Sequence, residues 1–551
     1  MTRFRFCLPL ILLGSAVALA AEPKLEISAA SLLARTRILS SDAFEGRAPG
    51  SAGEEKTVTY LAAEFEKLGL LPGNPDGTYF QNVPLVGITS RPTLSFAVGG
   101  RTLALTHVND FAGFSSRLAP VVEGRASDVV FVGYGVVAPE FNWDDFKDVD
   151  VRGKTVVMLI NDPPVPDAAT GQLDPNVFGG KAMTYYGRWT YKYEIAAQKG
   201  AAACLIVHET IPAAYPFGVV VNSWTRENFE IQAADGNAGH VALSAWLTLG
   251  ATQRLFRAGG HDFEKLKRLA ATRDFRPVAL GAKADFTVAN TLRPVASRNV
   301  AALLPGSDPH LKNEYVLYNA HWDHLGVDEK LKGDRIFNGA ADNAAGVAVL
   351  LEIAQAMRAL PPAQQPKRSV LFLSVTAEEK GLLGARYYAR HPLYPLARTV
   401  GLVNMDGANP FGRTRDLEII GFGASGIDDV GAAVAQAQGR IVRPDSHPER
   451  GSFFRSDHFE FAKVGVPSYY PKSGRDFIGQ PADFAERKVN EYIANDYHKP
   501  SDEVKPDWTF EGAAQDTEFL LRVGLRLATD PKWPEWNPGN PFKARRDAML
   551  R

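Results

Sequence analysis

The sequence predicts an α/β protein: a mostly parallel or mixed sheet flanked by helices, interrupted by an inserted domain that is mainly β. After residue 297, continuously apolar strands alternate with helix-like runs: "EYVLYNAHWDH", "AAGVAVLLEIAQAMRAL", "SVLFLSVTAEE" and "TVGLVNMDGAN". Such strands are typical of a largely parallel sheet covered on both faces. Between about 110 and 285 the texture changes to short β-rich runs such as "SDVVFVGYGVVAP", with one clear helix, "YKYEIAAQKG". This region is therefore expected to form a separate module.

The length of 551 residues indicates more than one domain, because hydrophobic cores stop growing near roughly 250–300 residues. Two helix-like segments, "ASLLARTRILSSDAF" and "GEEKTVTYLAAEFEKLGL", precede the β-rich region, and the second is expected to end at Gly69. These helices must pack on something later in the chain, so the main domain is expected to be discontinuous. In chain order the predicted units are 1–20 a signal peptide, 25–110 the first part of the main domain, 111–285 the insertion, 286–530 the rest of the main domain, and 531–551 a C-terminal tail on the surface.

The first residues, "MTRFRFCLPLILLGSAVALAAEPK", predict a secretory signal peptide. Arg3 and Arg5 precede a short apolar run, and Ala18-Leu19-Ala20 forms a small-x-small cleavage site near Ala20. The alternative is a membrane anchor, but the apolar run is shorter than the ~20 residues that a span needs. We therefore expect an exported protein, periplasmic or secreted, with no membrane attachment after cleavage.

The charge balance argues against a nucleic-acid partner. The chain has a formal charge of −1, and loss of Arg3 and Arg5 with the signal peptide leaves 59 basic against 62 acidic residues, or −3. No basic stripe attracts a polyanion. The exported chain retains a single cysteine, Cys204 in "AAACLIV", which excludes an internal disulfide. Its apolar context favours a core residue over a catalytic nucleophile.

Candidate functional residues follow the apolar strands, and functional groups in open α/β sheets gather at the carboxyl ends of strands. Taken singly, each has an ordinary structural explanation, such as a surface histidine, a helix cap or a solvated acid pair. Together, at strand ends and loops of one predicted domain, they indicate a common site. In chain order the set is His321, Asp342, Glu378, Glu379, Asp406 and His498, with Asp323 and Tyr497 beside the two histidines.

Two histidines with three carboxylates are a suitable ligand set for two divalent metal ions, one carboxylate bridging them. Oxygen donors alone suit Mg²⁺ or Ca²⁺, whereas added imidazole favours zinc, with Mn²⁺ or Co²⁺ as possible substitutes. Two zinc ions are therefore the expected cofactors. Asp323 is placed to orient the first histidine, since a zinc-bound histidine usually donates its other N–H to a carboxylate.

Five motifs carry a family resemblance: "AHWDHLG", "GAADNAAG", "TAEEKGLLG", "NMDG" and "DYHKPSDE". In this order they resemble the motifs of the dizinc peptidases of clan MH, family 28, which include secreted bacterial aminopeptidases and glutamate carboxypeptidases. The resemblance implies the zinc-aminopeptidase-like hydrolase fold and covers about residues 25 to 530. The inserted module resembles a protease-associated domain, a known insertion in this family.

The resemblance also assigns roles to residues. It implies that Asp342 bridges two metals, that His321 and Asp406 complete one site, and that Glu379 and His498 complete the other. Glu378 would be the general acid/base, Tyr497 would help to stabilise the oxyanion, and Asp323 would support the first histidine. It further implies a cis peptide bond between Asp342 and Asn343. The segment "FFRSDHFEFAKVGVP" resembles a family segment that walls the substrate pocket, through Ser456, Asp457 and His458.

These roles predict a zinc-dependent exopeptidase acting on peptides, most simply an aminopeptidase in which two metals share a water or hydroxide and Glu378 transfers its proton. A glutamate carboxypeptidase would also fit, and arginines would then bind the terminal carboxylate. Two more functions are compatible with the same fold: a glutaminyl-cyclase-like transferase with one working metal, and a receptor-like homologue with a dead site. Residue preference and oligomeric state are not predicted by the sequence. Arginines available for a carboxylate site are Arg413, Arg415, Arg455 and Arg475.

Overall fold

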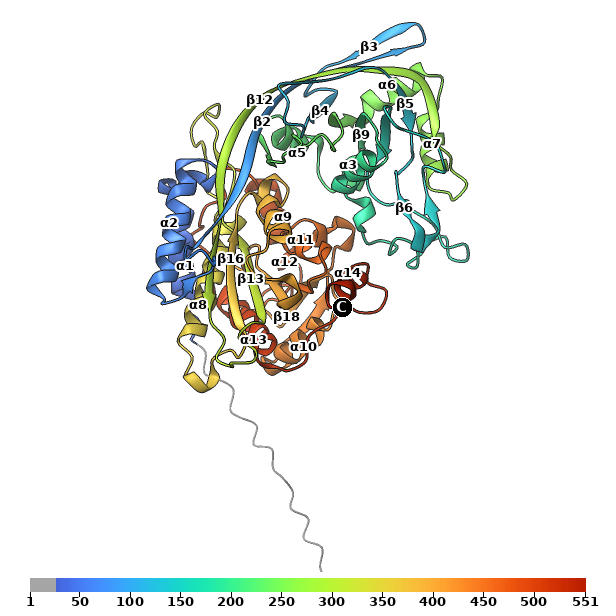
Figure 1. Ribbon diagram of the computed structural model, residues 1–551. Helices are drawn as coiled ribbons and strands as arrows, with labels where there is room; N and C mark the ends of the chain where they lie inside the picture. The colour runs from blue at the N-terminus through green and yellow to red at the C-terminus, as the bar shows by residue number, and fades with distance from the viewer. Residues whose placement is uncertain (1–25) are drawn as a thin grey trace, which may run out of the picture.

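The computed structural model describes residues 26–551, so the predicted signal peptide lies outside the described residues. The chain forms two lobes joined by a pair of very long strands (Figure 1). We call the part built from residues 299–551 and the N-terminal helices the larger lobe, and the part built from residues 101–277 the smaller lobe. Most of the core packing lies within the lobes, in separate hydrophobic clusters.

The sheet of the larger lobe is mixed, with a parallel centre. β13 pairs in parallel with both β16 and β17, and β17 pairs in parallel with β20. An antiparallel strand follows on either side, β12 beside β16 and β18 beside β20. The bounds of these strands are β12 Val278–Leu304, β13 Tyr315–His321, β16 Ser369–Val375, β17 Thr399–Asn404, β18 Asp416–Ile420, β19 Ile441–Pro444 and β20 Ser468–Ser473.

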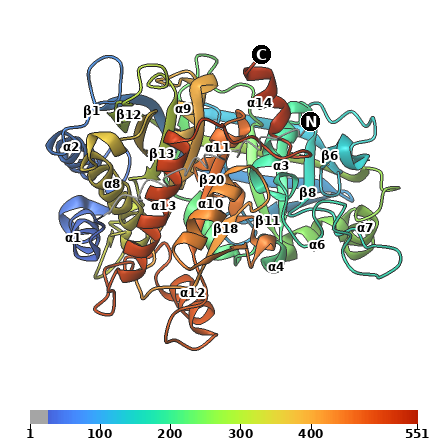
Figure 2. The same cartoon turned by 90° about the horizontal axis from the view of Figure 1, so that it is seen from below.

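Helices cover both faces of this sheet, as continuously apolar strands require. Val316 and Tyr318 of β13 point into the core formed with α1, α2, α8, α10 and α13, whereas Leu317 points into the core formed with α9 and α11. α8 and α13 pack side by side on the first face (Figure 2). The bounds are α1 Ala29–Leu39, α2 Ala52–Lys67, α8 Ala345–Arg358, α9 Leu383–Arg390, α10 Ile427–Ala437, α11 His458–Lys463, α12 Phe484–Asn495, α13 Glu511–Thr529 and α14 Lys543–Met549.

Both helices expected before the insertion are present as α1 and α2, and they pack on the sheet that follows the insertion. The chain leaves α2 through Gly69, whose φ of +73° is readily adopted by glycine. The C-terminal tail also packs on the larger lobe. Trp536 is 1% exposed, and its indole N–H donates to the carbonyl of Gly465 at 2.9 Å.

The two lobes share β2 (Phe80–Val98) and the 27-residue β12, which pair antiparallel from one lobe into the other. Phe96 of β2 and Phe286 of β12 belong to a core of the smaller lobe, while Val300 of β12 belongs to the core of the larger lobe. The passage between lobes therefore runs inside continuous strands, close to the predicted boundaries near 110 and 285. Figure 1 shows these strands arching over the top of the molecule.

The smaller lobe contains more helix than the sequence predicts. Its strands β5, β8, β9 and β11 are parallel, with β4 antiparallel at the edge. Helices α3 and α5 cover one face and α6 and α7 the other, so the lobe holds several helices besides the one that the sequence indicated. The bounds are β3 Arg101–Leu105, β4 Phe111–Phe114, β5 Val121–Phe131, β8 Thr155–Leu159, α3 Trp189–Gln198, β9 Ala203–His208, α4 Thr210–Ala213, α5 Phe217–Trp224, β10 Asn228–Ile231, β11 Leu243–Thr248, α6 Leu249–Ala258 and α7 Phe263–Ala270.

Cys204 lies on β9 in this lobe and is fully buried in the core beneath α3 and α5. Burial raises the pKa of its thiol well above the ordinary value, which confirms the expectation of a core residue. Among the helices of residues 26–551, none combines the length and the apolar character needed to cross a membrane.

One buried ion pair attaches the N-terminal helix to the sheet-covering helix α8. Arg35 Nη1 lies 2.6 Å from Glu352 Oε2, and the Glu352 side chain is 1% exposed. We expect Arg35→Met to lower the free energy of unfolding by about 3–5 kcal/mol, because it leaves a buried carboxylate without its counter-ion. Guanidinium unfolding followed by tryptophan fluorescence measures this loss.

The matched control for this pair is the exposed pair of Arg125 with Glu123, where Arg125→Met should cost less than about 1 kcal/mol. The double variant Arg35→Met/Glu352→Met should recover part of the loss, since no buried charge then remains. Equal stability of Arg35→Met and the unmodified protein would contradict this account of how α1 is held.

Candidate metal centre

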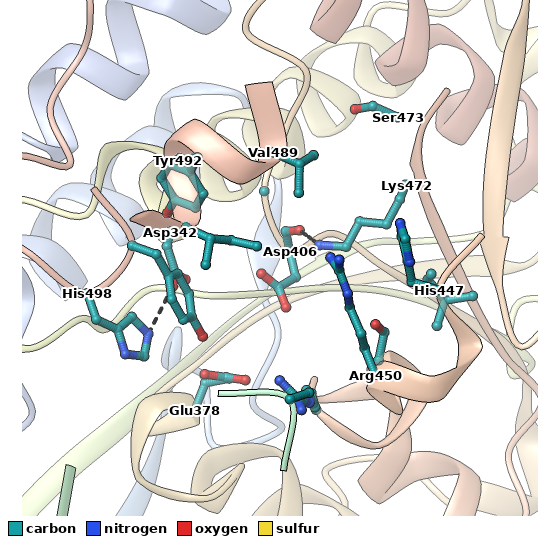
Figure 3. Close-up of a pocket in the computed structure, with 18 of the residues that line it drawn as sticks. Asp342, Glu378, Asp406, His447, Arg450, Lys472, Ser473, Val489, Tyr492 and His498 are labelled. Carbon is teal, nitrogen blue, oxygen red and sulfur yellow. Dashed lines mark hydrogen bonds and ion pairs between the residues drawn. The ribbon is translucent and has the colours of Figure 1, made fainter. Parts of the chain in front are cut away.

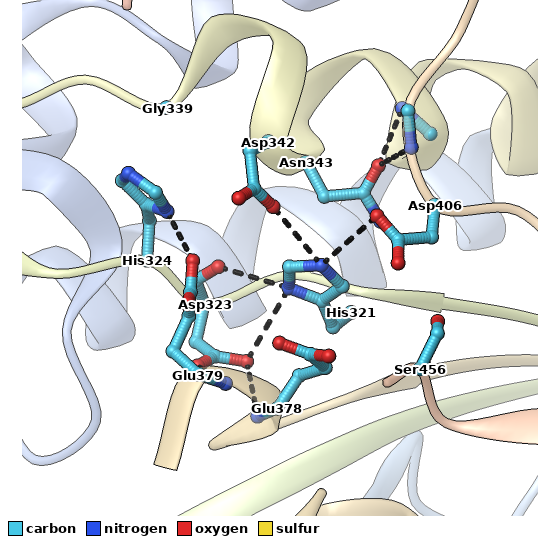
Figure 4. Close-up of polar contacts among 12 residues, drawn as sticks. His321, Asp323, His324, Gly339, Asp342, Asn343, Glu378, Glu379, Asp406 and Ser456 are labelled. Atoms are coloured by element: carbon cyan, nitrogen blue, oxygen red, sulfur yellow. Dashed lines mark hydrogen bonds and ion pairs between the residues drawn. The ribbon is translucent and has the colours of Figure 1, made fainter. Parts of the chain in front are cut away.

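The predicted site residues meet at one edge of the larger sheet, since the strands that carry them run in parallel. β13 ends at His321, β16 is followed by Glu378 and Glu379, and β17 is followed by Asp406. Asp342 precedes α8, in a short irregular turn at the same edge, and His498 comes from the loop after α12. Figure 4 shows Asp342, Glu378, Glu379 and Asp406 around His321.

Two groups of donor atoms share Asp342. On one side, His321 Nε2 lies 3.3 Å from Asp342 Oδ1 and 3.8 Å from Asp406 Oδ1. On the other, His498 Nε2 lies 3.3 Å from Asp342 Oδ2 and 3.1 Å from Glu379 Oε2. Asp342 therefore faces both groups with a different oxygen of the same carboxylate, the arrangement expected of a bridging ligand.

The cluster fits divalent metal ions. Ligand atoms of His321, Asp342 and Asp406 all lie within 4.8 Å of one another, close enough to hold one ion between them. Nε2 of His321 and Nε2 of His498 are buried and have no hydrogen-bond partner within the described residues. Buried polar atoms are normally paired, so these orphaned nitrogens, each beside carboxylate oxygens, indicate positions for cations.

The carboxylates and histidines of the cluster perturb one another strongly. Burial lowers the pKa of His498, but the charges of Glu379 and Asp342 outweigh burial and raise it to about 10. Burial raises the pKa of Asp406, but Lys472 and His321 reverse this effect and hold it well below its usual range. Asp406 is thus kept ionised, and His498 carries a compensating positive charge in the absence of metal.

Asp323 supports the first histidine from behind. It is fully buried, and its Oδ1 lies 3.8 Å from His321 Nδ1. The same carboxylate accepts hydrogen bonds from the backbone N–H groups of Glu378, at 3.0 Å, and Glu379, at 3.4 Å. It therefore links the end of β13 to the loop that carries the two glutamates.

The peptide bond between Asp342 and Asn343 is cis, as the resemblance implies. The Asn343 amide ties this turn to the loop after β17: its Nδ2 donates to Met405 O at 3.1 Å, and its Oδ1 accepts from Gly407 N at 2.8 Å. The loops bearing Asp342 and Asp406 are thereby held at a fixed separation.

Glu378 lies beside the cluster and takes a different position from Glu379. Its side chain borders a large cavity, whereas Glu379 is held by His324 and His498. Burial, together with the charges of Glu379, Asp457 and Asp406, raises the pKa of Glu378 well above its ordinary value, while His321 opposes this shift. A carboxyl with a raised pKa beside such a cluster has the properties of a proton-transfer group.

Tyr497 also borders the cavity. Its ring stacks on that of His498, with the centroids 3.9 Å apart, and the side chain is 40% exposed. The cavity has a volume of about 1520 Å³ and is lined by both lobes. Figure 3 shows Asp342, Glu378, Asp406 and His498 facing it.

Ser456, Asp457 and His458 do not wall this cavity, and the expectation for them is corrected. All three are at most 1% exposed and lie behind the site. Asp457 Oδ2 accepts from the amide of Asn319 at 3.1 Å, and Asn404 donates to Ser456 Oγ at 2.8 Å. Burial lowers the pKa of His458 to about 3, so it is a neutral ring packed between Phe453 and Tyr470. The cavity is instead reached by neighbouring side chains of the same segment, including Phe454, Arg455 and Phe459.

Sequence reasoning missed several residues that hold the site. His324 Nδ1 lies 2.6 Å from Glu379 Oε1, and the motif "HWDH" was the available signal. Asp502 accepts from the backbone N–H groups of Ala341, at 3.0 Å, and Asp342, at 3.2 Å. Tyr470 donates to Asp406 Oδ2 at 3.0 Å.

Arg47 is the most connected of these supports. It is 1% exposed and donates to the carbonyls of Leu39, Trp322, Asn338 and Gly339 at 2.6–2.9 Å. One guanidinium thus joins the N-terminal segment to the loop after His321 and to the turn before Asp342. Arg47 lies in the glycine-rich stretch "EGRAPG", but no local sequence pattern indicates which carbonyls it binds.

Part of the chain is similar to peptidase family M28. Residues 299–520 match the family model, and this range includes every residue of the metal cluster. The mouse (Mus musculus) aminopeptidase NAALADL1 is 33% identical over 130 residues, which are 23% of this chain and 16% of that protein. The chain therefore spans well under two thirds of this relative.

Two solved structures that align with most of this chain are named aminopeptidases. An aminopeptidase from Aneurinibacillus sp. strain AM-1 is 19% identical, with a TM-score of 0.49 over 92% of this chain and 95% of that one. A zinc aminopeptidase from Bacillus subtilis is 17% identical, with a TM-score of 0.44 over 93% of this chain and 98% of that one.

The first prediction for the centre concerns Arg47. A lysine keeps the charge but has a single ammonium in place of the planar guanidinium that reaches four carbonyls. We expect Arg47→Lys to weaken zinc binding by about 10-fold or more, as loss of groups that orient metal ligands usually does. Competition titration with a zinc chelator measures the affinity. Arg37→Lys, an exposed change on the preceding helix α1, is the control, and equal affinities of the two variants would refute the role of Arg47.

The second prediction concerns pH. In metal-free protein the pKa of His498 is raised from 6.5 to about 10, so the stabilisation from its protonated form is complete below pH 6.5 and is lost as pH rises through 10. We therefore expect the Tm of chelator-treated protein to fall between pH 7 and 10, by more than in His498→Gln. Thermal denaturation across this range is the measurement, and the same pH profile in both proteins would exclude His498 as its origin.

Proposed function

We propose that the protein is a zinc-dependent aminopeptidase that removes N-terminal residues from peptides. The observation that carries this proposal is the pair of donor groups sharing Asp342, bordered by Glu378 and open to a cavity of peptide size. Imidazole mixed with carboxylate donors favours zinc among the common divalent ions. The match of residues 299–520 to a peptidase family model, and the name of the mouse relative, support the choice of reaction.

The metal ligands proposed for one ion are His321 and Asp406, those for the other are Glu379 and His498, and Asp342 serves both. When bound, such ions supply Lewis acidity, which polarises a carbonyl and lowers the pKa of water. His324 takes the second oxygen of Glu379, and Asp323 supports His321. Each ligand is therefore oriented by a second group, as metal ligands usually are.

Glu378 is proposed to move the proton. Its raised pKa lets it accept a proton from the attacking water and return that proton to the amine that leaves. Its carboxyl oxygens, with those of Asp406, would also accept hydrogen bonds from the free α-ammonium of the substrate. Tyr497 stands on the cavity side of His498, where its hydroxyl can donate to the oxyanion that develops on the scissile carbonyl.

The place of action is proposed from the N-terminal sequence. The apolar run and the small-x-small site at Ala18-Leu19-Ala20 support export, so the substrates would be extracytoplasmic peptides.

Metal content and substrate class test the proposal together. Purified protein should contain two zinc ions per chain, and it should cleave aminoacyl p-nitroanilides and unblocked peptides. N-terminally acetylated peptides of the same sequence should not be cleaved. Equal cleavage of blocked and unblocked peptides would remove the aminopeptidase assignment.

Glu378→Gln tests the proton-transfer role. We expect it to keep both zinc ions and to lower kcat by about 10²–10⁴-fold, since the amide cannot accept the proton. Steady-state kinetics and metal analysis on the same sample measure kcat and the zinc content. Glu491→Gln, which changes a cavity-lining glutamate on α12, is the control. Full turnover in Glu378→Gln would exclude this residue as the base.

A further inference from the structure

Two arginines at the contact between the lobes have no counter-ion. Arg188 lies immediately before α3 of the smaller lobe and is 7% exposed, and Arg455 follows the turn at Ser452–Phe454 of the larger lobe. Both side chains line the cavity. Nε of Arg188 and both Nε and Nη2 of Arg455 are buried without a hydrogen-bond partner. Among residues 26–551, neither guanidinium is paired with a carboxylate.

The two guanidinium groups are held close together by aromatic packing across the lobe boundary. The ring of Tyr185 in the smaller lobe packs on those of Phe454 and Phe459, with ring centroids 5.9 and 4.9 Å away. The ring centroid of Tyr215 lies 5.7 Å from the guanidinium carbon of Arg455. Burial, and then repulsion by Arg455, lower the pKa of Arg188 to about 9. Guanidinium groups are in general charged at neutral pH, so two positive charges share one wall of the cavity.

The start of α3 adds to this positive region. The helix runs for ten residues from Trp189, and its first residues, Trp189 and Thr190, line the same cavity. No side chain caps it, so its first N–H groups are not satisfied by a capping oxygen. The positive end of a helix dipole favours an anion at this position.

A buried charge without a partner is costly, and a guanidinium pairs best with a carboxylate, through two parallel hydrogen bonds. Glu379 and Asp406 do not fill this role, because they are engaged with histidines. We propose that Arg188 and Arg455 together bind a carboxylate of the substrate. This rests on the proposed function and deepens it: the preferred substrates are short peptides that present a carboxylate on the far side of the scissile bond.

Arg188 and Arg455 lie beside the proposed catalytic residues, so the carboxylate that they bind should lie a short distance from the scissile bond. Tyr497, which stacks on His498, lies close enough to both arginines to interact with them electrostatically. A carboxylate near Tyr497 belongs to one of the first residues after the cleaved bond. It is supplied either by the C-terminus of a very short peptide or by an acidic side chain.

Four dipeptides distinguish these sources in the zinc-loaded, full-length protein: Leu-Ala with a free C-terminus, Leu-Ala amide, Leu-Glu amide and Leu-Gln amide. We expect kcat/KM for Leu-Ala to exceed that for its amide by about 10–100-fold, the range for hydrogen bonds to charged groups. A similar excess of Leu-Glu amide over Leu-Gln amide would identify an acidic side chain as the source. Equal kcat/KM within both pairs would overturn the inference.

Variants assign the effect to these arginines. In Arg188→Gln and in Arg455→Gln, the acid-to-amide ratio of kcat/KM should fall toward one. Arg152→Gln, which changes an exposed arginine of the smaller lobe, should keep the ratio of the unmodified protein. An unchanged ratio in both cavity variants would also overturn the inference. Both substrates are measured on the same sample, so a fraction of misfolded protein lowers both kcat/KM values equally and leaves their ratio unchanged.

The same substrates separate this inference from the proposed function. If acetylated Leu-Ala with a free C-terminus is cleaved as fast as Leu-Ala, the aminopeptidase assignment fails but the carboxylate site stands. If both acid and amide pairs are cleaved equally and acetylated Leu-Ala is not cleaved, the aminopeptidase assignment stands and the carboxylate site fails.

Discussion

The concentration of negative charge at one buried edge of the larger sheet is the constraint on which the site depends. Glu378, Glu379, Asp342 and Asp406 lie close together where the sheet meets the cavity, and like charges so placed repel one another strongly. Histidines on opposite sides of Asp342 offset part of this charge, and bound cations would offset the rest. Three buried side chains hold the loops that carry these carboxylates in place. Arg47 donates to four backbone carbonyls, and Asn343 bonds to the loop after β17. Asp323 accepts hydrogen bonds from the loop that carries Glu378 and Glu379.

The residues of the metal centre could be predicted from the sequence because the topology of the sheet brings them together. Parallel strands end at a common edge, so residues that follow β13, β16 and β17 must meet even though 85 residues separate His321 from Asp406. The supports were harder to find, since their partners are backbone atoms. Arg47 contacts carbonyls nearly 300 residues away, and nothing in its local pattern specifies them. The segment around Ser456 was placed correctly near the site, but its direction was not: the side chains of residues 456–458 turn into the core, and Arg455 turns into the cavity.

The smaller lobe shows where sequence patterns are weakest. Its helices α5, α6 and α7 are only 8–10 residues long and alternate with short apolar strands, so their periodicity is brief and the region appears β-rich. Its contribution to the cavity is also invisible from the sequence. Arg188 and Tyr215 lie more than 100 residues before the metal-binding motifs, yet the fold returns them to the same cavity. A substrate preference built across two lobes therefore has no contiguous motif.

The long strands β2 and β12 determine how the two halves of this cavity move relative to each other. A flexible linker would let the lobes turn freely, whereas a hydrogen-bonded ribbon that is continuous from one core to the other resists twisting and yields mainly by bending. On the opposite side the lobes touch through Met183 N and Pro448 O at 3.0 Å and through Lys463 and Glu194 at 3.4 Å. The lobes are thus joined by a continuous strand pair on one side and by these two contacts on the other, so a wider opening of the cavity would require the strand pair to bend and the two contacts to break.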